Sequence, residues 1–279
     1  MPTVACPDCA NQVSTIAPAC PSCGRPWPAQ PLSTATTKGR EYTHTSPGMP
    51  LRVLPFSLSG ITAGLLWVTA VAFAVAGTSA LAYFGTWRQW RDGSFWVFET
   101  RASVDELADV ETFTLGAFSV ALTVFIFTAV VFFAWFFSAY RTAQSRGAVG
   151  RQWGPGWTIG GWLIPIANLA LPKLVMNEVD KMSSPEAGAP PLEYRWRGSA
   201  RLVISDVWWI TWITALAVLV AGGVLLALAD PRIGDYPREN EFGAGLMVSA
   251  FGYLLLALAA VLGSVVVVVI GRRLRGSNM

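Results

Sequence analysis

Four cysteines near the start of the chain are the residues whose type and spacing best suit a chemical role. Cys6 and Cys9 form one CxxC pair, and Cys20 and Cys23 form a second, with ten residues between the two pairs. Each pair can present two thiolates to one ion, and four thiolates complete the tetrahedral shell that zinc prefers. We therefore predict a structural zinc ion bound by these four cysteines.

The predicted metal site defines a zinc ribbon over residues 1–28. A segment this small cannot fold by hydrophobic burial alone, so the metal would supply its folding energy. All four ligands are sulfur, which leaves no open coordination position for catalysis. A redox dithiol pair, or a ribbon that has lost its metal, remains the alternative. The segment resembles the short zinc ribbons at the ends of many bacterial proteins, and this resemblance implies a docking or structural module.

The rest of the chain has the composition of a membrane protein. Of the 279 residues, 53% are hydrophobic and 13% are charged, whereas soluble domains contain about 25% charged residues. Four apolar runs, at 56–84, 113–140, 202–229 and 242–270, each exceed the roughly 20 residues that span a bilayer. We predict an all-α, multi-pass transmembrane domain over residues 52–275. Residues 29–51 are rich in Pro, Ser and Thr and are predicted to be a flexible linker.

Charge predicts the orientation of these spans. Segments 1–55, 141–201 and 271–279 together contain 15 Lys and Arg against 6 Asp and Glu, whereas segments 85–112 and 230–241 contain 5 against 10. Basic segments stay on the cytoplasmic side of bacterial membranes. The pattern therefore predicts a protein of the inner (plasma) membrane with both termini in the cytoplasm, where cysteines remain reduced. The net charge of +3 and the ribbon's lack of a basic patch argue against a nucleic-acid partner.

A fifth apolar run, at 157–171, fits this scheme only if it does not cross the bilayer. It is about 15 residues long and contains Pro165, which disfavours a helix at the preceding residue. Pro172 then begins a stretch in which Val175, Val179 and Met182 share one helical face. We predict a re-entrant or interfacial broken hairpin over 157–182, ending in an amphipathic helix at the membrane surface.

The residues of this segment are similar to a known family. The sequence WTIGGWLIPIANL at 157–169, the preceding WFFSAYR at 135–141 and the tryptophans of WWITW at 208–212 resemble the bacterial membrane family known as domain of unknown function 4328, common in actinobacteria. The similarity extends over residues 56–270, with departures from the family pattern at Thr142, Gln144 and Lys181. It implies a multi-pass membrane protein and no known reaction or catalytic residue.

Few residues of the membrane part are candidates for chemistry. The chain has no phosphate-binding glycine loop, and its one histidine, His44, lies in the linker. Asp206, near the start of the third span, could pair with a basic residue and orient a site, or could pair with Arg201 or be solvated. Asn168, between two prolines, could satisfy freed backbone carbonyls or contact a ligand. The sequence reveals no catalytic constellation, so we do not expect an enzyme.

Four surfaces of the chain could contact partners. The bilayer surrounds the predicted spans, and an unidentified cytosolic protein is the expected partner of the ribbon. Gly60 and Gly64 form a GxxxG motif that suggests a homo-oligomer. A basic, aromatic patch suits anionic lipid, although ordinary positive-inside flanking explains its charges equally well. The patch consists of Arg195, Trp196, Arg197 and Arg201. The leading hypothesis is a non-enzymatic membrane scaffold or regulator. The alternative is a small-solute or lipid transporter or channel that uses the broken segment 157–172.

Overall fold

The computed structural model describes residues 3–6, 9, 11–14, 22–23, 58–92, 102–229 and 239–276. The chain divides into two compact units, residues 1–52 and 53–279. In the first unit, β1 (Thr3–Ala5) and β2 (Gln12–Ser14) pair in an antiparallel hairpin in which Val4 lies opposite Val13. His44 lies outside the described residues.

The described part of the second unit is helical. Its long helices are α1 (Leu58–Asp92), α2 (Val104–Gln144), α5 (Val203–Leu228) and α6 (Glu239–Gly276). Shorter elements lie between α2 and α5: α3 (Trp157–Leu163), η1 (Ala167–Leu169), α4 (Leu171–Ser183), η2 (Pro185–Ala187) and η3 (Arg195–Gly198). Four of these helices, α1, α2, α5 and α6, are long and apolar enough to cross a membrane. The prediction of four helices with the length and apolarity to span a membrane is therefore confirmed.

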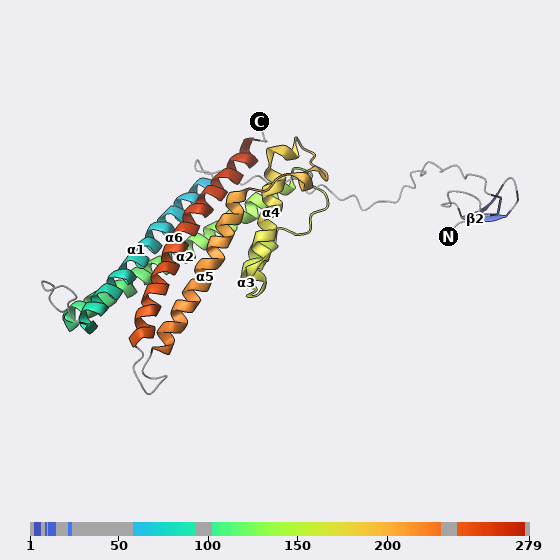
Figure 1. Ribbon diagram of the computed structural model, residues 1–279. Helices are drawn as coiled ribbons and strands as arrows, with labels where there is room; N and C mark the ends of the chain where they lie inside the picture. Colours follow the sequence, from blue (N-terminus) through green and yellow to red (C-terminus); the bar gives the residue numbers. More distant parts are fainter. Residues whose placement is uncertain are drawn as a thin grey trace. The chain divides into compact units, whose positions relative to one another are not determined.

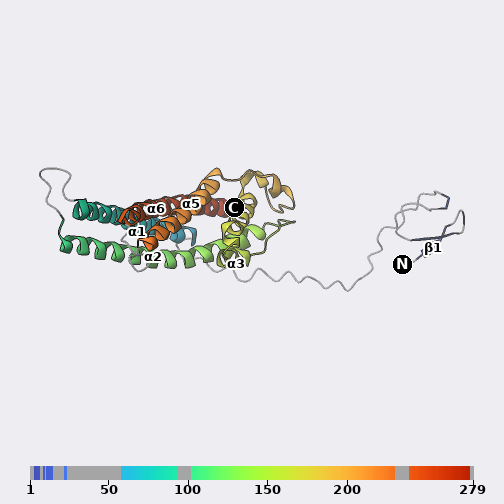
Figure 2. The same cartoon turned by 60° about the horizontal axis from the view of Figure 1, so that its bottom comes forward.

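Helix α6 is the centre of the bundle. It packs against α1 on one side and α5 on the other, and α2 packs against α1 (Figures 1 and 2). More than half of the apolar window of α6 is buried inside the protein, against 11% for α5. Small residues allow this close packing, because a side chain at Gly222 of α5 would place its Cβ 2.4 Å from Ser249 Oγ of α6.

Hydrogen bonds and aromatic rings join α2 to the other helices. The hydroxyls of Thr69 and Thr128 lie 2.8 Å apart between α1 and α2. Rings join α2 to α5: the Phe125 and Trp212 centroids are 5.8 Å apart, and those of Phe132 and Trp208 are 6.2 Å apart. Such pairs add to the stability gained from buried area.

Helix α3 fills the space between α2 and α5 at one end of the bundle. Trp162 of α3 lies 5.9 Å from the Phe132 ring of α2 and 5.7 Å from the Trp209 ring of α5. The helix ends at Leu163 because Ile164, which precedes Pro165, has the extended backbone (φ −92°, ψ 113°) that a following proline favours. Figure 1 shows α3 beside α5, with α4 at the end of the bundle where α6 terminates.

Candidate functional site

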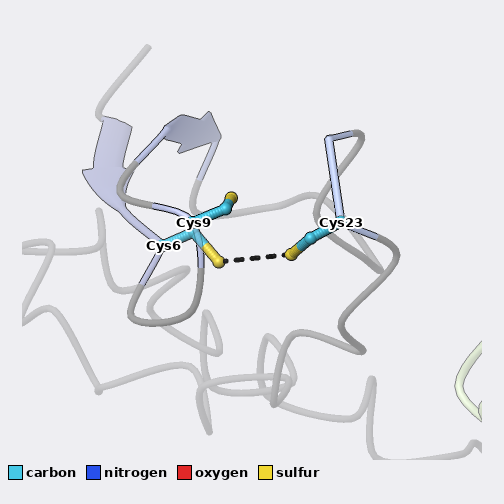
Figure 3. A group of neighbouring side chains, drawn as sticks. All are labelled: Cys6, Cys9 and Cys23. Atoms are coloured by element: carbon cyan, nitrogen blue, oxygen red, sulfur yellow. Dashed lines mark hydrogen bonds between the residues drawn. The ribbon is translucent and has the colours of Figure 1, made fainter.

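The first candidate site is the cysteine cluster of the N-terminal unit. The hairpin places Cys6 at the end of β1, where its backbone N–H donates to the Asn11 carbonyl at 2.9 Å. The sulfurs of Cys6, Cys9 and Cys23 all lie within 4.8 Å of one another. The Cys6 and Cys23 sulfurs face each other at 3.7 Å (Figure 3). The fourth predicted ligand, Cys20, lies outside the described residues.

This spacing of sulfurs fits a shared metal ion. Thiolates about 2.3 Å from a tetrahedral zinc ion stand about 3.8 Å from one another. The Cys6–Cys23 distance of 3.7 Å matches that value, and it is far longer than the roughly 2.05 Å of a disulfide. The three cysteines therefore lie close enough together to bind a metal.

The second candidate site surrounds α4 in the helical unit. Four of its apolar side chains, Val175, Met176, Val179 and Met182, are each at most 1% exposed. Nine of its 13 residues are buried. The helix predicted after Pro172 is confirmed, its placement at the membrane surface stays a prediction, and its polar face carries Lys173, Glu178 and Asp180. Other parts of the protein cover that face as well, because its charged residues have partners there.

Lys173 is the first of these buried charges. Its Nζ lies 2.7 Å from Ser205 Oγ and 2.9 Å from an Asp206 carboxylate oxygen, both on the first turn of α5. The suggested pairing of Asp206 with Arg201 is therefore wrong, since Lys173 of α4 takes that role. Burial lowers the pKa of Lys173, although the hydrogen bond and charge of Asp206 act in the opposite direction.

Asp180, the next buried charge of α4, is fully buried and is the centre of a network of charged and polar groups. One carboxylate oxygen accepts a hydrogen bond from the Leu202 backbone N–H at 2.7 Å, and the other accepts one from Arg273 at 3.0 Å. Burial raises the pKa of Asp180, opposed by the Leu202 hydrogen bond and by Arg273. A single side chain of α4 therefore joins the start of α5 to the end of α6.

Glu178 holds the segment that follows α2. It accepts a hydrogen bond from the Gln152 backbone N–H at 2.8 Å and one from the Tyr140 hydroxyl at 3.2 Å. The Tyr140 hydroxyl also donates to the Trp153 carbonyl. Glu178 is 7% exposed. Both of its carboxylate oxygens are thus engaged by the protein.

The basic, aromatic segment before α5 is mostly structural. The Trp196 indole is 4% exposed and donates to the Val149 carbonyl at 3.0 Å. Arg195 donates to the Ala189 and Pro191 carbonyls, each at 2.7 Å. Arg197 donates to the Gly150 carbonyl. Arg201, in contrast, is exposed and forms no ion pair with a described residue.

A polar cavity of about 540 Å³ is lined in part by residues of this basic segment. It lies between α4, η3 and residues 150–153, and Gln152, Asn177, Glu178, Lys181, Arg197 and Arg201 contribute to its polar wall. Leu174 and Trp153 contribute its apolar part. Arg197 and Arg201 belong to the basic patch predicted from the sequence, whereas Lys181 and Glu178 are brought to the cavity by the fold around α4.

Three other residues singled out from the sequence, Asn168, Gly60 and Gly64, do not line this cavity. Asn168 lies in η1, and its Oδ1 is buried without a hydrogen-bond partner among the described residues. Gly64 of the GxxxG motif is exposed, and a Cβ there would meet no atom within 4 Å. Gly60 is exposed as well. The motif therefore does not mediate close packing between the described helices of this unit.

Comparison with known protein families gives a match over most of the helical unit. A family model described as Domain of unknown function (DUF4328) matches residues 98–272, which include α2 to α5 and most of α6. The match begins after α1, whereas the similarity was expected to begin at residue 56. Neither the search of curated proteins nor that of solved structures gives a match.

Proposed function

The chain belongs to the DUF4328 family, and from that premise we propose that it is a non-enzymatic scaffold or regulator of the bacterial plasma membrane. In this proposal residues 1–28 form a zinc ribbon that contacts a cytosolic protein, residues 29–51 form a flexible linker, and residues 52–275 form the membrane domain. The single observation that carries it is the buried charge network around Asp180, which joins three helices. Both oxygens of the Asp180 carboxylate are already hydrogen-bonded within the protein.

The network suits a rigid platform. Charged groups that act as acids, bases or nucleophiles need access to a substrate. Asp180 is fully buried and Glu178 is 7% exposed, and both carboxylates are already hydrogen-bonded by the protein. Pairing buried charges in this way holds α4, α5 and α6 in one arrangement. A fixed arrangement is what a membrane anchor for a tethered binding module requires.

The proposed topology places both termini and α4 in the cytoplasm, with α3 and η1 entering the inner leaflet as a broken hairpin. The charge of the connecting segments supports this placement. So does the exposure of apolar residues along the hairpin: Leu163 is 71% exposed and Ile166 is 86% exposed. Side chains of this kind favour contact with lipid over contact with water.

The scaffold proposal is tested by quantitative proteomics on the full-length protein, cross-linked in the membranes of its host. The double variant Cys20→Ser and Cys23→Ser removes two predicted zinc ligands, and Ser22→Ala changes the same loop without removing a thiol. Cytosolic proteins enriched by the wild type should be retained by Ser22→Ala and lost with the double variant. An identical set of partners for all three proteins would overturn the proposal.

A transporter or channel that uses residues 157–172 is the second candidate. Its support is the broken backbone at Ile164 and the buried, unpartnered Oδ1 of Asn168, since interrupted segments in membranes often form substrate sites. Reconstituted liposomes would show solute flux that Asn168→Ala reduces. Flux equal to that of protein-free liposomes would reject this candidate and leave the scaffold proposal intact.

A further inference from the structure

We propose that the cavity between α4, η3 and residues 150–153 binds the headgroup of an anionic phospholipid. Its volume of about 540 Å³ falls within the range of about 300–1,000 Å³ that is usual for small-molecule sites. The inference rests on the proposed placement of α4 at the inner leaflet, where such lipids are available. It goes beyond the proposed scaffold role by naming a ligand class and its site.

The charge of the cavity wall favours an anion. Lys181, Arg197 and Arg201 contribute three cationic groups, and Glu178 contributes one carboxylate. The Glu178 oxygens already accept hydrogen bonds from Gln152 N–H and the Tyr140 hydroxyl. A phosphate group therefore meets a net positive wall whose one carboxylate is engaged elsewhere.

Two of the polar side chains are left with capacity for a ligand. Arg201 forms no ion pair with a described residue, and Lys181 uses one of its three donors on the Arg197 carbonyl at 3.0 Å. The amide of Asn177 also lines the cavity, and its Oδ1 is buried without a partner among the described residues.

The apolar side of the cavity continues onto the surface of α3. Leu174, which lines the cavity, is 44% exposed. Trp153 lines it as well, and its ring meets the Trp157 ring of α3 edge to face at 5.8 Å. Farther along the hairpin that begins with Trp157, further apolar residues are exposed, Leu163 and Ile166 among them.

The continuity of polar and apolar surfaces selects a phospholipid over a free anion. A soluble phosphate would use the cationic wall and gain nothing from the exposed hydrophobic residues beside it. A phospholipid would place its phosphate against Lys181 and Arg201 and its acyl chains along α3, where each buried CH₂ contributes about 0.8 kcal/mol. The expected ligand is therefore a lipid whose headgroup carries a net negative charge.

The test is a titration of the detergent-solubilised, full-length protein with short-chain phosphatidylglycerol, followed by microscale thermophoresis. Lys181→Gln and Arg201→Gln each remove one cavity charge and should each raise the Kd about fivefold, and the double variant about 30-fold. Lys181→Arg keeps the charge and should bind as the wild type does. Arg272→Gln is the matched control, because Arg272 is an exposed cation outside the cavity wall.

Each outcome has a defined meaning. Short-chain phosphatidylcholine and inorganic phosphate should bind at least tenfold more weakly than phosphatidylglycerol; equal binding of either would overturn the lipid assignment. Equal losses in Arg201→Gln and Arg272→Gln would reduce the effect to surface charge and overturn the site. Reporter fusions at Ala187 separate the two proposals: an external signal there rejects the cytoplasmic placement, whereas a cytoplasmic signal without lipid selectivity rejects the cavity inference alone.

Discussion

Removal of the Asp180 carboxylate should destabilise the helical unit more than the loss of any exposed charge. In Asp180→Ala, the Leu202 N–H loses a charge-assisted hydrogen bond of 2.7 Å and Arg273 loses its 3.0 Å partner. Loss of such a bond costs about 1.5–3 kcal/mol, and breaking a fully buried ion pair costs about 3–5 kcal/mol. The Arg273 side chain is 23% exposed and partly solvated, so we expect about 3 kcal/mol, near the lower bound for a buried pair.

The same geometry ranks a series of variants. Asp180→Asn keeps an oxygen that can accept from the Leu202 N–H but loses the charge opposite Arg273, so it should cost about 1–2 kcal/mol. The double variant Asp180→Ala with Arg273→Met removes both partners. It should cost less than the two single changes added together, with a coupling energy of about 1–2 kcal/mol.

Thermal unfolding in detergent measures this series. For a unit of this size, a loss of 3 kcal/mol corresponds to a fall in Tm of about 6–12 °C. Asp92→Asn is the control, because the Asp92 side chain is 43% exposed and pairs with the neighbouring Arg91 at the surface; exposed pairs of this kind contribute little. A Tm for Asp180→Ala within a degree of that of Asp92→Asn, or strict additivity of the double variant, would refute the reasoning.

Three further changes probe other parts of the unit. Gly222→Leu should lower stability by about 1–3 kcal/mol through overpacking, because its Cβ would lie 2.4 Å from Ser249 Oγ. Gly223→Leu is the control and should change the Tm little, because no atom lies within 4 Å of a Cβ at that position. Trp162→Ala should cost about 2–3 kcal/mol by emptying a half-buried aromatic site. An unchanged Tm would contradict a stabilising role for the packing of Trp162 between α2 and α5. Burial lowers the pKa of Lys173 in the folded protein. At pH values just below the ordinary lysine pKa of about 10.5, the unfolded chain therefore binds more protons than the folded protein, and the stability of the fold rises with pH. The Tm of the wild type relative to Lys173→Met should therefore increase from about pH 8 to about pH 10, and a decrease would show the opposite sign of shift.

The membrane-spanning helices could be predicted because long apolar runs have few other stable arrangements. Their ends could not be read from apolarity alone. Helix α2 begins at Val104, nine residues before the apolar run that starts at 113, because Ser103 and Glu106 form a capping box. The Ser103 hydroxyl accepts from Glu106 N–H at 3.1 Å, and the Glu106 carboxylate accepts from Ser103 N–H at 2.8 Å. That motif is visible in the sequence, and reading it would have extended the helix.

The environment of α4 could not be predicted in the same way. An amphipathic helix with Lys173, Glu178 and Asp180 on its polar side has one sequence pattern, whether those charges meet water or protein. The difference lies in partners distant along the chain: Asp180 pairs with Arg273, 93 positions away. No local period records such a pairing, so the amphipathic pattern could not show that these charges are buried.

The charged residues of α4 fall into two groups, one bound to partners within the protein and one facing the cavity. Lys173, Glu178 and Asp180 each meet a partner from a neighbouring element, and each is at most 9% exposed. Lys181 forms no ion pair with a described residue and faces the cavity that Arg201 also lines. Placing a cation beside a cavity without a carboxylate partner keeps it available for an anion from outside the chain. Substitution of the first three should therefore change the Tm, whereas substitution of Lys181 should change lipid affinity and leave the Tm nearly constant.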